Sequence, residues 1–281
     1  MTTLPFPVRL VIFDLDGVIY READPVPGVA DAIAALEAAG IATRFATNNS
    51  TADRDAYVAR LDAMGIRTRR EAVVTSTSAT VEHLARHAPQ VHHLLAIGEA
   101  GLFDELRAAG FAVTAARDAV TRDYAGGPLE RVYDAVVVGL DRELDYRSIA
   151  AATTAIRQGA TFIATNADER YPTASGFLPG AGSAVAAIEI AGGVTPLVIG
   201  KPQPEMFASV LAAAGIPAGE AMVVGDNPAA DIVAARRAGI RSVLVLTGLA
   251  DADAAASLDG ELRPDHVIPS AADLPHLLGA A

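Results

Sequence analysis

The sequence contains no cysteine. Disulfide bonds, zinc sites built on thiolates and cysteine nucleophiles are therefore excluded for this chain. Basic side chains are also scarce, since 22 lysines and arginines stand against 34 aspartates and glutamates, giving a formal net charge of −12. This acidic balance argues against nucleic acid or an anionic membrane surface as a main partner. It leaves open the binding of small anions at a local site.

A long uninterrupted apolar run is missing as well. The most apolar long stretch, Ala181–Gly200, is interrupted by a charged residue, two glycines and a proline, at Glu189, Gly192, Gly193 and Pro196. Such a stretch indicates a helix followed by a strand and not a membrane span. The first ten residues lack the basic flank and apolar core of a signal peptide. We therefore expect a cytoplasmic protein without a membrane partner.

Apolar side chains are plentiful, at 51% of 281 residues, which is enough for one large domain or two modest ones. Strand-like and helix-like segments alternate along most of the chain, and this predicts an α/β protein with a parallel sheet. The strand-like runs are 9–13, 41–46, 136–139, 162–165, 197–199, 222–224 and 242–246. The helix-like runs are 29–39, 54–64, 146–158, 205–214 and 229–238. Several of these helices are expected to stop at a glycine, namely Gly40, Gly65, Gly159, Gly215 and Gly239.

Polar clusters follow four of the predicted strands at the point where each strand ends. They are Asp14 with Asp16, the "TNNS" stretch at 47–50, Lys201, and the "DNPAAD" stretch at 226–231. In an open parallel sheet the carboxyl ends of the strands lie along one edge, where ligands bind. Residues far apart in the sequence, such as Asp14 and Asp226, are therefore expected to converge.

The first cluster, "DLDG", places two carboxylates two residues apart, followed by Gly17. Alternation along an extended chain would put Asp14 and Asp16 on the same side. Their repulsion is tolerable where a hard cation such as Mg²⁺ neutralises them, with Asp226 as a third oxygen ligand. One aspartate could then attack phosphorus while the other transfers a proton. The alternative is structural, because aspartates also cap turns and helices.

The other clusters also allow two interpretations. Thr47, Asn48 and Asn49 could hold phosphate oxygens in a turn, or they could serve the start of the helix that follows. Lys201 is the sole lysine of the chain, and it could neutralise phosphate charge or lie exposed on the surface. Asp231 could orient Lys201 or a metal-bound water, or it could favour the amino end of a helix.

Taken together, these motifs resemble the haloacid dehalogenase superfamily of phosphatases. "DLDGVIY" resembles its first motif, "TNNS" its second, "GKP" its third and "GDNPAAD" its fourth. The stretches 136–168 and 179–193 resemble subclass IIA, whose members carry a large C2-type α/β cap and include NagD-like and p-nitrophenyl phosphatases and phosphatases of phosphoglycolate, glycerol 3-phosphate and pyridoxal phosphate. Inside the fourth motif, residues 227–230 depart from the Arg or Thr often found in relatives, although both aspartates remain.

The resemblance implies a role for each motif residue. Asp14 would be the nucleophile, and Asp16 the acid and base whose main-chain carbonyl also binds Mg²⁺. Lys201 would stabilise the nucleophile and the transferred phosphoryl group. The remaining implied roles are phosphate binding by Thr47, Asn48 and Asn49, Mg²⁺ binding by Asp226, and support from Gly17 and Asp231.

The segment between the second and third motifs is longer than one crossover needs. We expect a Rossmann-like core at residues 1–87 and 196–281 and an inserted cap at residues 88–195. A cap can exclude water and contact the leaving group. The loop 166–177 is the candidate for substrate selection, and Arg170 in it could bind a second anionic group of the substrate, although an ordinary solvated loop is the alternative.

The leading functional hypothesis is a Mg²⁺-dependent phosphatase acting on a small phosphorylated metabolite, with no nucleic-acid partner. Candidate substrates are glycerol phosphate, phosphoglycolate, a nucleoside monophosphate, a sugar phosphate and pyridoxal phosphate. A phosphotransferase or mutase on the same scaffold is one alternative, and a phospho-accepting signalling module is another. Relatives with this cap are often dimers, so the resemblance also suggests a homodimer.

Overall fold

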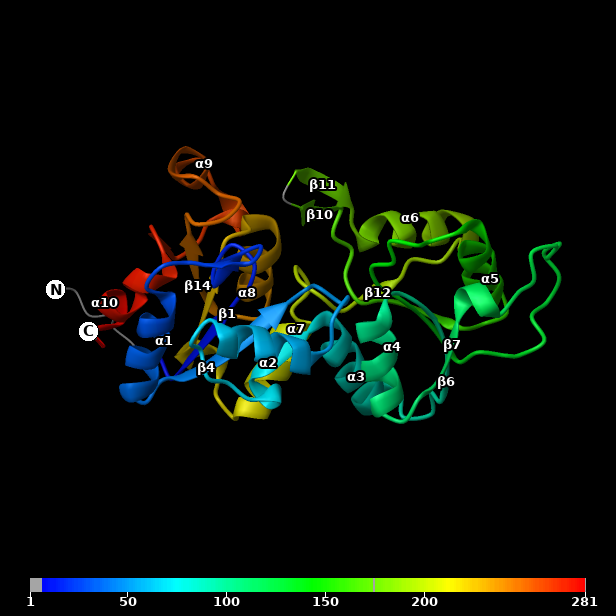
Figure 1. Cartoon of the computed structure of the whole chain (residues 1–281), viewed down its shortest axis with the longest axis horizontal. Helices are drawn as coiled ribbons and strands as arrows, with labels where there is room; N and C mark the ends of the chain where they lie inside the picture. The colour runs from blue at the N-terminus through cyan, green and yellow to red at the C-terminus, as the bar shows by residue number, and fades with distance from the viewer. Residues whose placement is uncertain (1–6, 174, 281) are drawn as a thin grey trace. The chain divides into compact units, whose positions relative to one another are not determined.

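The computed structural model describes residues 7–173 and 175–280 (Figure 1). The chain divides into two compact units. Unit 1 is formed from residues 1–47, 54–74 and 201–281, as far as these are described, and unit 2 from residues 48–53 and 75–200. Residues 75–87 and 196–200, which the sequence pattern assigned to the core, lie in unit 2, because the helix at 76–87 and the strand at 197–198 pack there.

Unit 1 is built on a sheet with the strand order β15-β14-β13-β1-β4-β5. The pairings of β1 with β13 and β4, and of β14 with β13 and β15, are all parallel. Every residue of β1 and β13 is buried, as expected for central strands of a sheet covered on both faces. The strand bounds are β1 Leu10–Phe13, β4 Ala42–Thr47, β5 Val73–Thr75, β13 Ala221–Gly225, β14 Arg241–Val245 and β15 His266–Ile268.

Helices α1 and α7 pack on β4, and α8 packs on β14. The helices of unit 1 are α1 Val29–Ala38, α2 Arg54–Ala63, α7 Glu205–Ala214, α8 Val233–Arg237, α9 Ala252–Ala256 and α10 Leu274–Leu278. Short 3₁₀ turns occur at η1 Arg70–Ala72, η3 Ala218–Glu220, η5 Gly260–Leu262 and η6 Ala271–Asp273, and a π-helical turn, η4 Pro228–Ile232, leads into α8. A small hairpin, β2 Tyr20–Arg21 with β3 Asp24–Pro25, follows β1.

Unit 2 has its own parallel sheet, in the order β12-β9-β8-β6-β7. Its strands are β6 His93–Ile97, β7 Ala112–Ala115, β8 Ala135–Val138, β9 Thr161–Ala164 and β12 Leu197–Val198. Helices α5 and α6 pack on β8 and on each other, and α4 packs on β7 and α3. The helices are α3 Ser76–His87, α4 Ala100–Ala108, α5 Tyr146–Arg157 and α6 Ala181–Gly192, with a 3₁₀ turn η2 Ala116–Asp118. An antiparallel hairpin, β10 Arg170–Thr173 with β11 Gly176–Pro179, precedes α6.

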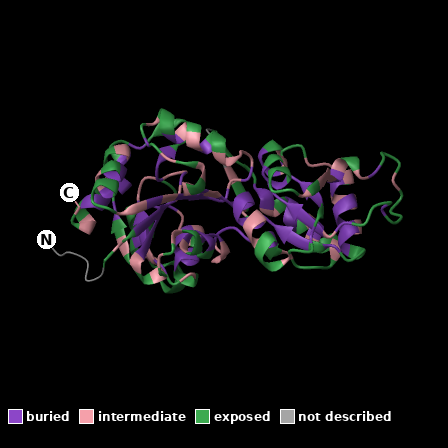
Figure 2. Cartoon of the chain, turned by 90° about the horizontal axis from the view of Figure 1, so that it is seen from below, coloured by how far each residue is buried: buried purple, intermediate pink, exposed green. Residues whose placement is uncertain are grey.

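The predicted α/β class with parallel sheets is confirmed (Figure 1). Figure 2 shows the strands of each sheet buried, while the helices alternate buried and exposed faces, as amphipathic sequences require. The glycines expected to stop helices have left-handed φ angles between 63° and 104°. Within the described residues, none of the helices combines the length and apolar character that a bilayer crossing demands.

Candidate active site

The carboxyl ends of β1 and β13 bring two acidic residues together in unit 1. Asp14 follows Phe13 of β1, and its main-chain N–H donates to the carbonyl of Val224 in β13 over 2.8 Å. Asp226 is the first residue after β13. Because parallel neighbouring strands end at the same edge, their following residues converge, as the sequence predicted for this pair. The carboxylates of Asp14, Asp226 and Asp231 offer oxygen atoms that all lie within 4.8 Å of one another.

Lys201 is buried at the centre of this cluster. Its Nζ donates to Asp14 Oδ1 over 2.5 Å, to Asp231 Oδ1 over 2.7 Å and to the carbonyl of Ala46 over 3.2 Å. The side chain is only 3% exposed, so the alternative of a surface lysine is excluded. A buried ammonium needs partners for each of its protons, and these acceptors provide them.

Burial and mutual repulsion both oppose the negative charge of this carboxylate cluster. Burial raises the pKa of Asp14 well above its ordinary value; Lys201 lowers it, and Asp231 and Asp226 raise it further. Burial, with repulsion from Asp231, raises the pKa of Asp226 to about 7. Burial opposes the charge of Lys201, but Asp14 and Asp231 outweigh it and raise the pKa of the lysine. One lysine therefore does not neutralise the cluster, and a further cation would favour the ionised carboxylates.

Asp231 lies in the π-helical turn η4 and faces back toward the sheet. Its Oδ1 accepts from Lys201, and its Oδ2 accepts from the main-chain N–H of Asn227 over 3.1 Å. A side chain at Gly225 would overlap it, because a Cβ there would lie 2.3 Å from Asp231 Cβ. Asp231 thus orients Lys201, while the capping role of the turn falls to the Asn227 side chain, which accepts from Ala229 N and Ala230 N.

The loop after β14 also contributes to the site, and sequence reasoning missed it. The main-chain N–H of Leu249 donates to Asp226 Oδ2 over 2.8 Å, and Thr247 Oγ1 donates to the carbonyl of Gly17 over 2.6 Å. A Cβ at Gly248 would lie 1.9 Å from Asp226 Oδ2, and one at Gly17 would lie 2.3 Å from the same atom. A signal was present, because the "TGLA" stretch follows a strand as the four recognised clusters do.

Asp16 is half-buried, and its carboxylate is not part of the close group formed by Asp14, Asp226 and Asp231. Its backbone pairs with Tyr20 in an isolated bridge. Burial raises the pKa of Asp16, while Arg60 and Lys201 lower it. The Arg60 guanidinium lies over the Tyr20 ring at 3.5 Å from its centroid, which holds this cation in place. A carboxyl group with a raised pKa is suited to carrying a proton.

The "TNNS" stretch begins at the last residue of β4 and crosses the boundary between the units. Thr47 ends β4 and is buried in unit 1, whereas Asn48 belongs to unit 2. The Asn49 side chain accepts from Thr51 N over 2.9 Å and from Thr51 Oγ1 over 2.7 Å. Asn49 therefore shapes the turn with its side chain, and phosphate binding by this residue stays a prediction.

Arg170 is the first residue of β10 and is exposed. Its guanidinium lies 5.6 Å from the centroid of the Phe177 ring, on the opposite strand of the hairpin. Residues 170–173 and 176–177 of the loop predicted to select the substrate therefore form strands of a hairpin, while residue 174 lies outside the described residues. An exposed cation above an aromatic ring is a favourable site for an anionic group.

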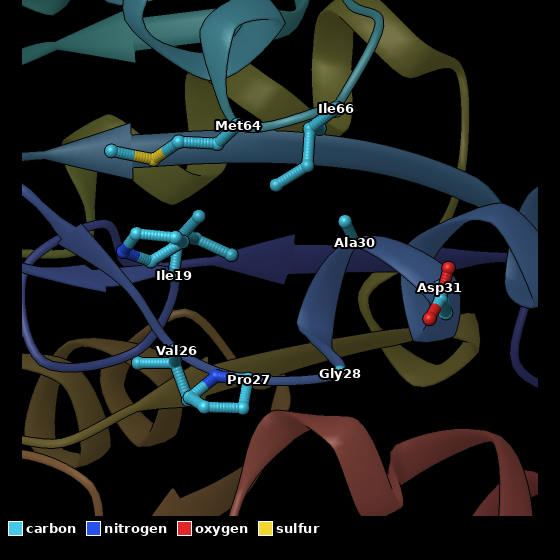
Figure 3. A pocket seen from close by; sticks show the side chains of 9 residues that line it. Ile19, Val26, Pro27, Gly28, Ala30, Asp31, Met64 and Ile66 are labelled. Carbon is cyan, nitrogen blue, oxygen red and sulfur yellow. The ribbon is translucent and has the colours of Figure 1, made fainter.

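A cavity of about 190 Å³ lies elsewhere in unit 1, between the β2–β3 hairpin, α1 and the end of α2 (Figure 3). Its lining is mostly apolar and includes Ile19, Val26 and Ile66, and Asp31 is its one charged residue. A phosphate site needs hydrogen-bond donors or cations. The lining of this cavity is therefore unsuited to binding a phosphate group.

Comparison with known families agrees with this geometry. The sequence pattern of the haloacid dehalogenase-like hydrolases matches residues 11–112, and a pattern described as HAD-hydrolase-like matches residues 198–274. The first match includes Asp14 and Thr47, and the second includes Lys201 and Asp226.

Individual relatives cover nearly the whole chain. An acid sugar phosphatase of Staphylococcus aureus is 33% identical over 241 residues, which are 86% of this chain and 87% of the relative. A hypothetical protein of Pyrococcus horikoshii OT3 is 37% identical with a TM-score of 0.86, over 96% of this chain and 99% of the other. A 4-nitrophenylphosphatase of Thermotoga maritima is 30% identical with a TM-score of 0.84, over 96% and 97% of the two chains.

Proposed function

Since the chain belongs to the haloacid dehalogenase-like hydrolases and is a phosphoric monoester hydrolase, we propose that it hydrolyses a small phosphorylated metabolite with Mg²⁺ and through an aspartyl-phosphate on Asp14. The observation that carries this proposal is the contact of Lys201 Nζ with the carboxylates of Asp14 and Asp231 at the end of β1. A carboxylate held by a buried lysine can serve as a nucleophile toward a bound phosphoryl group.

The donor set of the cluster supports Mg²⁺. Three carboxylates meet there, and burial raises the pKa of both Asp14 and Asp226. Mg²⁺ prefers oxygen ligands and commonly takes one or two carboxylates together with substrate phosphate. We propose that Asp14, Asp226 and the main-chain carbonyl of Asp16 hold the ion, and that Asp231 supports it. The ion would supply positive charge that Lys201 alone does not provide.

The reaction divides into two displacements. An Asp14 carboxylate oxygen attacks phosphorus, the bond from phosphorus to the ester oxygen breaks, and Asp16 gives its proton to that oxygen. Asp16 then accepts a proton from water, whose oxygen attacks the phosphorus of the acyl phosphate and releases Asp14 and inorganic phosphate. Thr47 and the main chain of Asn48 hold the phosphoryl oxygens, and Lys201 offsets the charge that they carry.

The relatives and the hairpin support a proposal for the substrate class. The acid sugar phosphatase and the 4-nitrophenylphosphatase are named for small phosphomonoesters, and we propose sugar phosphates, glycerol phosphate, phosphoglycolate and nucleoside monophosphates as the first substrates to test. The exposed Arg170 beside Phe177 would favour a leaving group with a second anionic group.

A homodimer is the proposed assembly, and light scattering after size-exclusion chromatography measures the oligomeric state.

Replacement of the nucleophile tests the proposed mechanism. We expect Asp14→Asn to lower phosphate release from p-nitrophenyl phosphate by at least about a thousandfold, because an amide does not form the acyl phosphate. The variant is expected to stay folded, because Lys201 keeps Asp231 and the carbonyl of Ala46 as acceptors and one of the clustered negative charges is removed. Its thermal unfolding midpoint checks this. Asp62→Asn, on the exposed face of α2, is the control and should keep wild-type activity. A folded, active Asp14→Asn variant would exclude Asp14 as the nucleophile.

Metal removal and a substrate panel complete the test. Dialysis against a chelator is expected to stop phosphate release, and added Mg²⁺ is expected to restore it. Full activity in excess chelator would contradict the metal assignment.

Phosphate release from each of the metabolites named above then ranks the substrates by kcat/KM. Transfer of phosphate to an added sugar phosphate without release of free phosphate would indicate a phosphotransferase instead.

A further inference from the structure

Asn48, whose main chain is proposed to hold the phosphoryl group, is anchored on several sides within unit 2. Its carbonyl accepts from Ser76 Oγ over 2.6 Å and from Asn166 Nδ2 over 2.8 Å. Its side-chain Nδ2 donates to both carboxylate oxygens of Asp168, over 2.9 and 3.2 Å. Two of these partners, Asn166 and Asp168, are about 120 positions away from Asn48 in the sequence.

The chemistry of these partners determines how the Asn48 amide is oriented. An ionised carboxylate only accepts hydrogen bonds, so the NH₂ group of Asn48 must face Asp168 and Oδ1 must point away from it. Oδ1 then lies against the chain at Gly200, where a Cβ would approach it to 2.6 Å. Asn48 is 8% exposed, so loss of Asp168 would remove a charged acceptor from a nearly buried amide.

Asp168 is fixed by its own main chain. Its carbonyl accepts from Gly182 N over 2.9 Å, at the first turn of α6. Its N–H donates to Asn166 Oδ1 over 3.2 Å. A side chain at Gly180 would not fit, since a Cβ there would lie 2.1 Å from the Asp168 carbonyl oxygen. The carboxylate therefore projects from a rigid support at the start of α6, and β10 begins two residues later at Arg170.

We propose that Asp168 is a positioning residue for the phosphatase reaction: it orients Asn48 so that the main chain there presents its N–H to the phosphoryl group. This inference rests on the proposed function. Asp168 touches no reacting atom in this scheme. It acts through the Asn48 amide and connects that amide to the hairpin proposed to contact the leaving group. Because the phosphoryl group is common to every substrate, loss of Asp168 should affect all substrates alike.

The test compares Asp168→Ala with Glu169→Gln. Glu169 is the next residue, exposed, and it contributes its main-chain carbonyl, not its carboxylate, to the bond with Gly180. We expect Asp168→Ala to weaken inhibition by inorganic phosphate about tenfold, because a hydrogen bond to a charged group is lost from a nearly buried amide. The value of kcat/KM should fall by a similar factor for p-nitrophenyl phosphate, glycerol 3-phosphate and a sugar phosphate. Glu169→Gln should leave both quantities near wild type.

Two further variants separate positioning from mere support of the fold. Asp168→Asn keeps one acceptor oxygen and should recover part of the phosphate inhibition, and it provides the test even if Asp168→Ala folds poorly. In an Asn48→Ala background, Asp168→Ala should cause little further loss, because the two residues act through one contact. Full additivity of the two changes would overturn the proposal.

The remaining outcomes are equally decisive. A lower unfolding midpoint with unchanged phosphate inhibition would make Asp168 a structural residue only. Losses that differ among leaving groups, with unchanged phosphate inhibition, would place its effect on the leaving group instead. Calorimetric titration of inorganic phosphate in the presence of Mg²⁺ measures the effect on binding without turnover. A wild-type protein that binds phosphate but releases none from any ester would refute the proposed function. Phosphate binding by wild type and by Asp168→Ala would still test the positioning role of Asp168.

Discussion

Lys201 is the residue on which the charge balance of the site depends. It is the sole lysine of the chain, and its Nζ joins Asp14, which follows β1, to Asp231 in η4. These two carboxylates are contributed by segments more than 200 residues apart. A single cation therefore connects the proposed nucleophile to the fourth motif, which gives the lysine a structural role beside its proposed chemical one.

Replacement of Lys201 should therefore cost both stability and activity. Lys201→Met leaves Asp14 and Asp231 buried without their cation, and we expect the free energy of unfolding to fall by about 3–5 kcal/mol, as is typical when one partner of a buried ion pair is removed. Urea unfolding in the presence of a chelator measures this. The double variant Lys201→Met/Asp231→Asn should recover part of the loss, because one unpaired charge is then removed. A loss below about 1 kcal/mol would mean that water reaches the carboxylates.

The raised pKa of Asp226 predicts how stability depends on pH. Its pKa is about 7 in the folded protein against 3.8 ordinarily, so the folded state binds the extra proton between these values. The stability contributed by protonated Asp226 is complete below about pH 4 and is lost as the pH rises through 7. The proposed Mg²⁺ would bind the ionised form of Asp226. Mg²⁺ should therefore raise the thermal unfolding midpoint more at about pH 7.5 than at about pH 5.

The control for this pH effect is Asp226→Asn, which has a similar shape and no charge. In chelator, the stability of this variant should change less between about pH 5 and pH 7.5 than that of the wild type. Its unfolding midpoint should also respond weakly to Mg²⁺. An equal Mg²⁺ response of wild type at both pH values would show that Asp226 does not take up the proton in this range.

At the scale of secondary-structure elements, the strand ends explain what was predictable from the sequence. Strand and helix patterns placed Asp14 and Asp226 after the buried strands β1 and β13, and parallel pairing was enough to predict that these two residues converge. Lys201 instead follows β12, an edge strand of the unit 2 sheet, so strand order does not explain its place in the cluster. The contribution of Leu249 was not predicted, because its bond to Asp226 comes from a main-chain N–H that any residue type carries. Short elements such as the β10–β11 hairpin were also missed, since a few residues give too little periodicity.

The loop after β14 gives a prediction at this scale. Gly248→Ala would place a methyl group 1.9 Å from Asp226 Oδ2, so the loop or the carboxylate must move. Because groups that support a metal ligand typically change affinity 10–100-fold, we expect the Mg²⁺ concentration for half-maximal activity to rise about tenfold or more. Gly219→Ala is the control, because no atom lies within 4 Å of a Cβ there. An unchanged Mg²⁺ requirement for Gly248→Ala would show that the loop yields without disturbing Asp226.

At the scale of the whole molecule, the boundary between the units is a property of tertiary packing. The segment 48–53 directly follows β4, and local sequence gives no reason to separate it from unit 1. It packs in unit 2 because Gly101 closely approaches the main chain of Ala52 and because Leu140 N donates to Ser50 Oγ. Contacts over such sequence distances leave no periodic signal, so the sequence placed the boundary later, at residue 87.

The division into units also predicts where Mg²⁺ should stabilise the chain. The carboxylate group found among the described residues, Asp14 with Asp226 and Asp231, lies wholly in unit 1. A ligand that binds only the folded form reduces local opening of the segments that hold it. Hydrogen exchange in Mg²⁺ against chelator should therefore show the largest gain in protection at 10–17, 221–232 and 241–250, with smaller changes at 93–164. Asp226→Asn should abolish most of this gain. A gain that is larger in unit 2 than in unit 1 would place the metal site elsewhere.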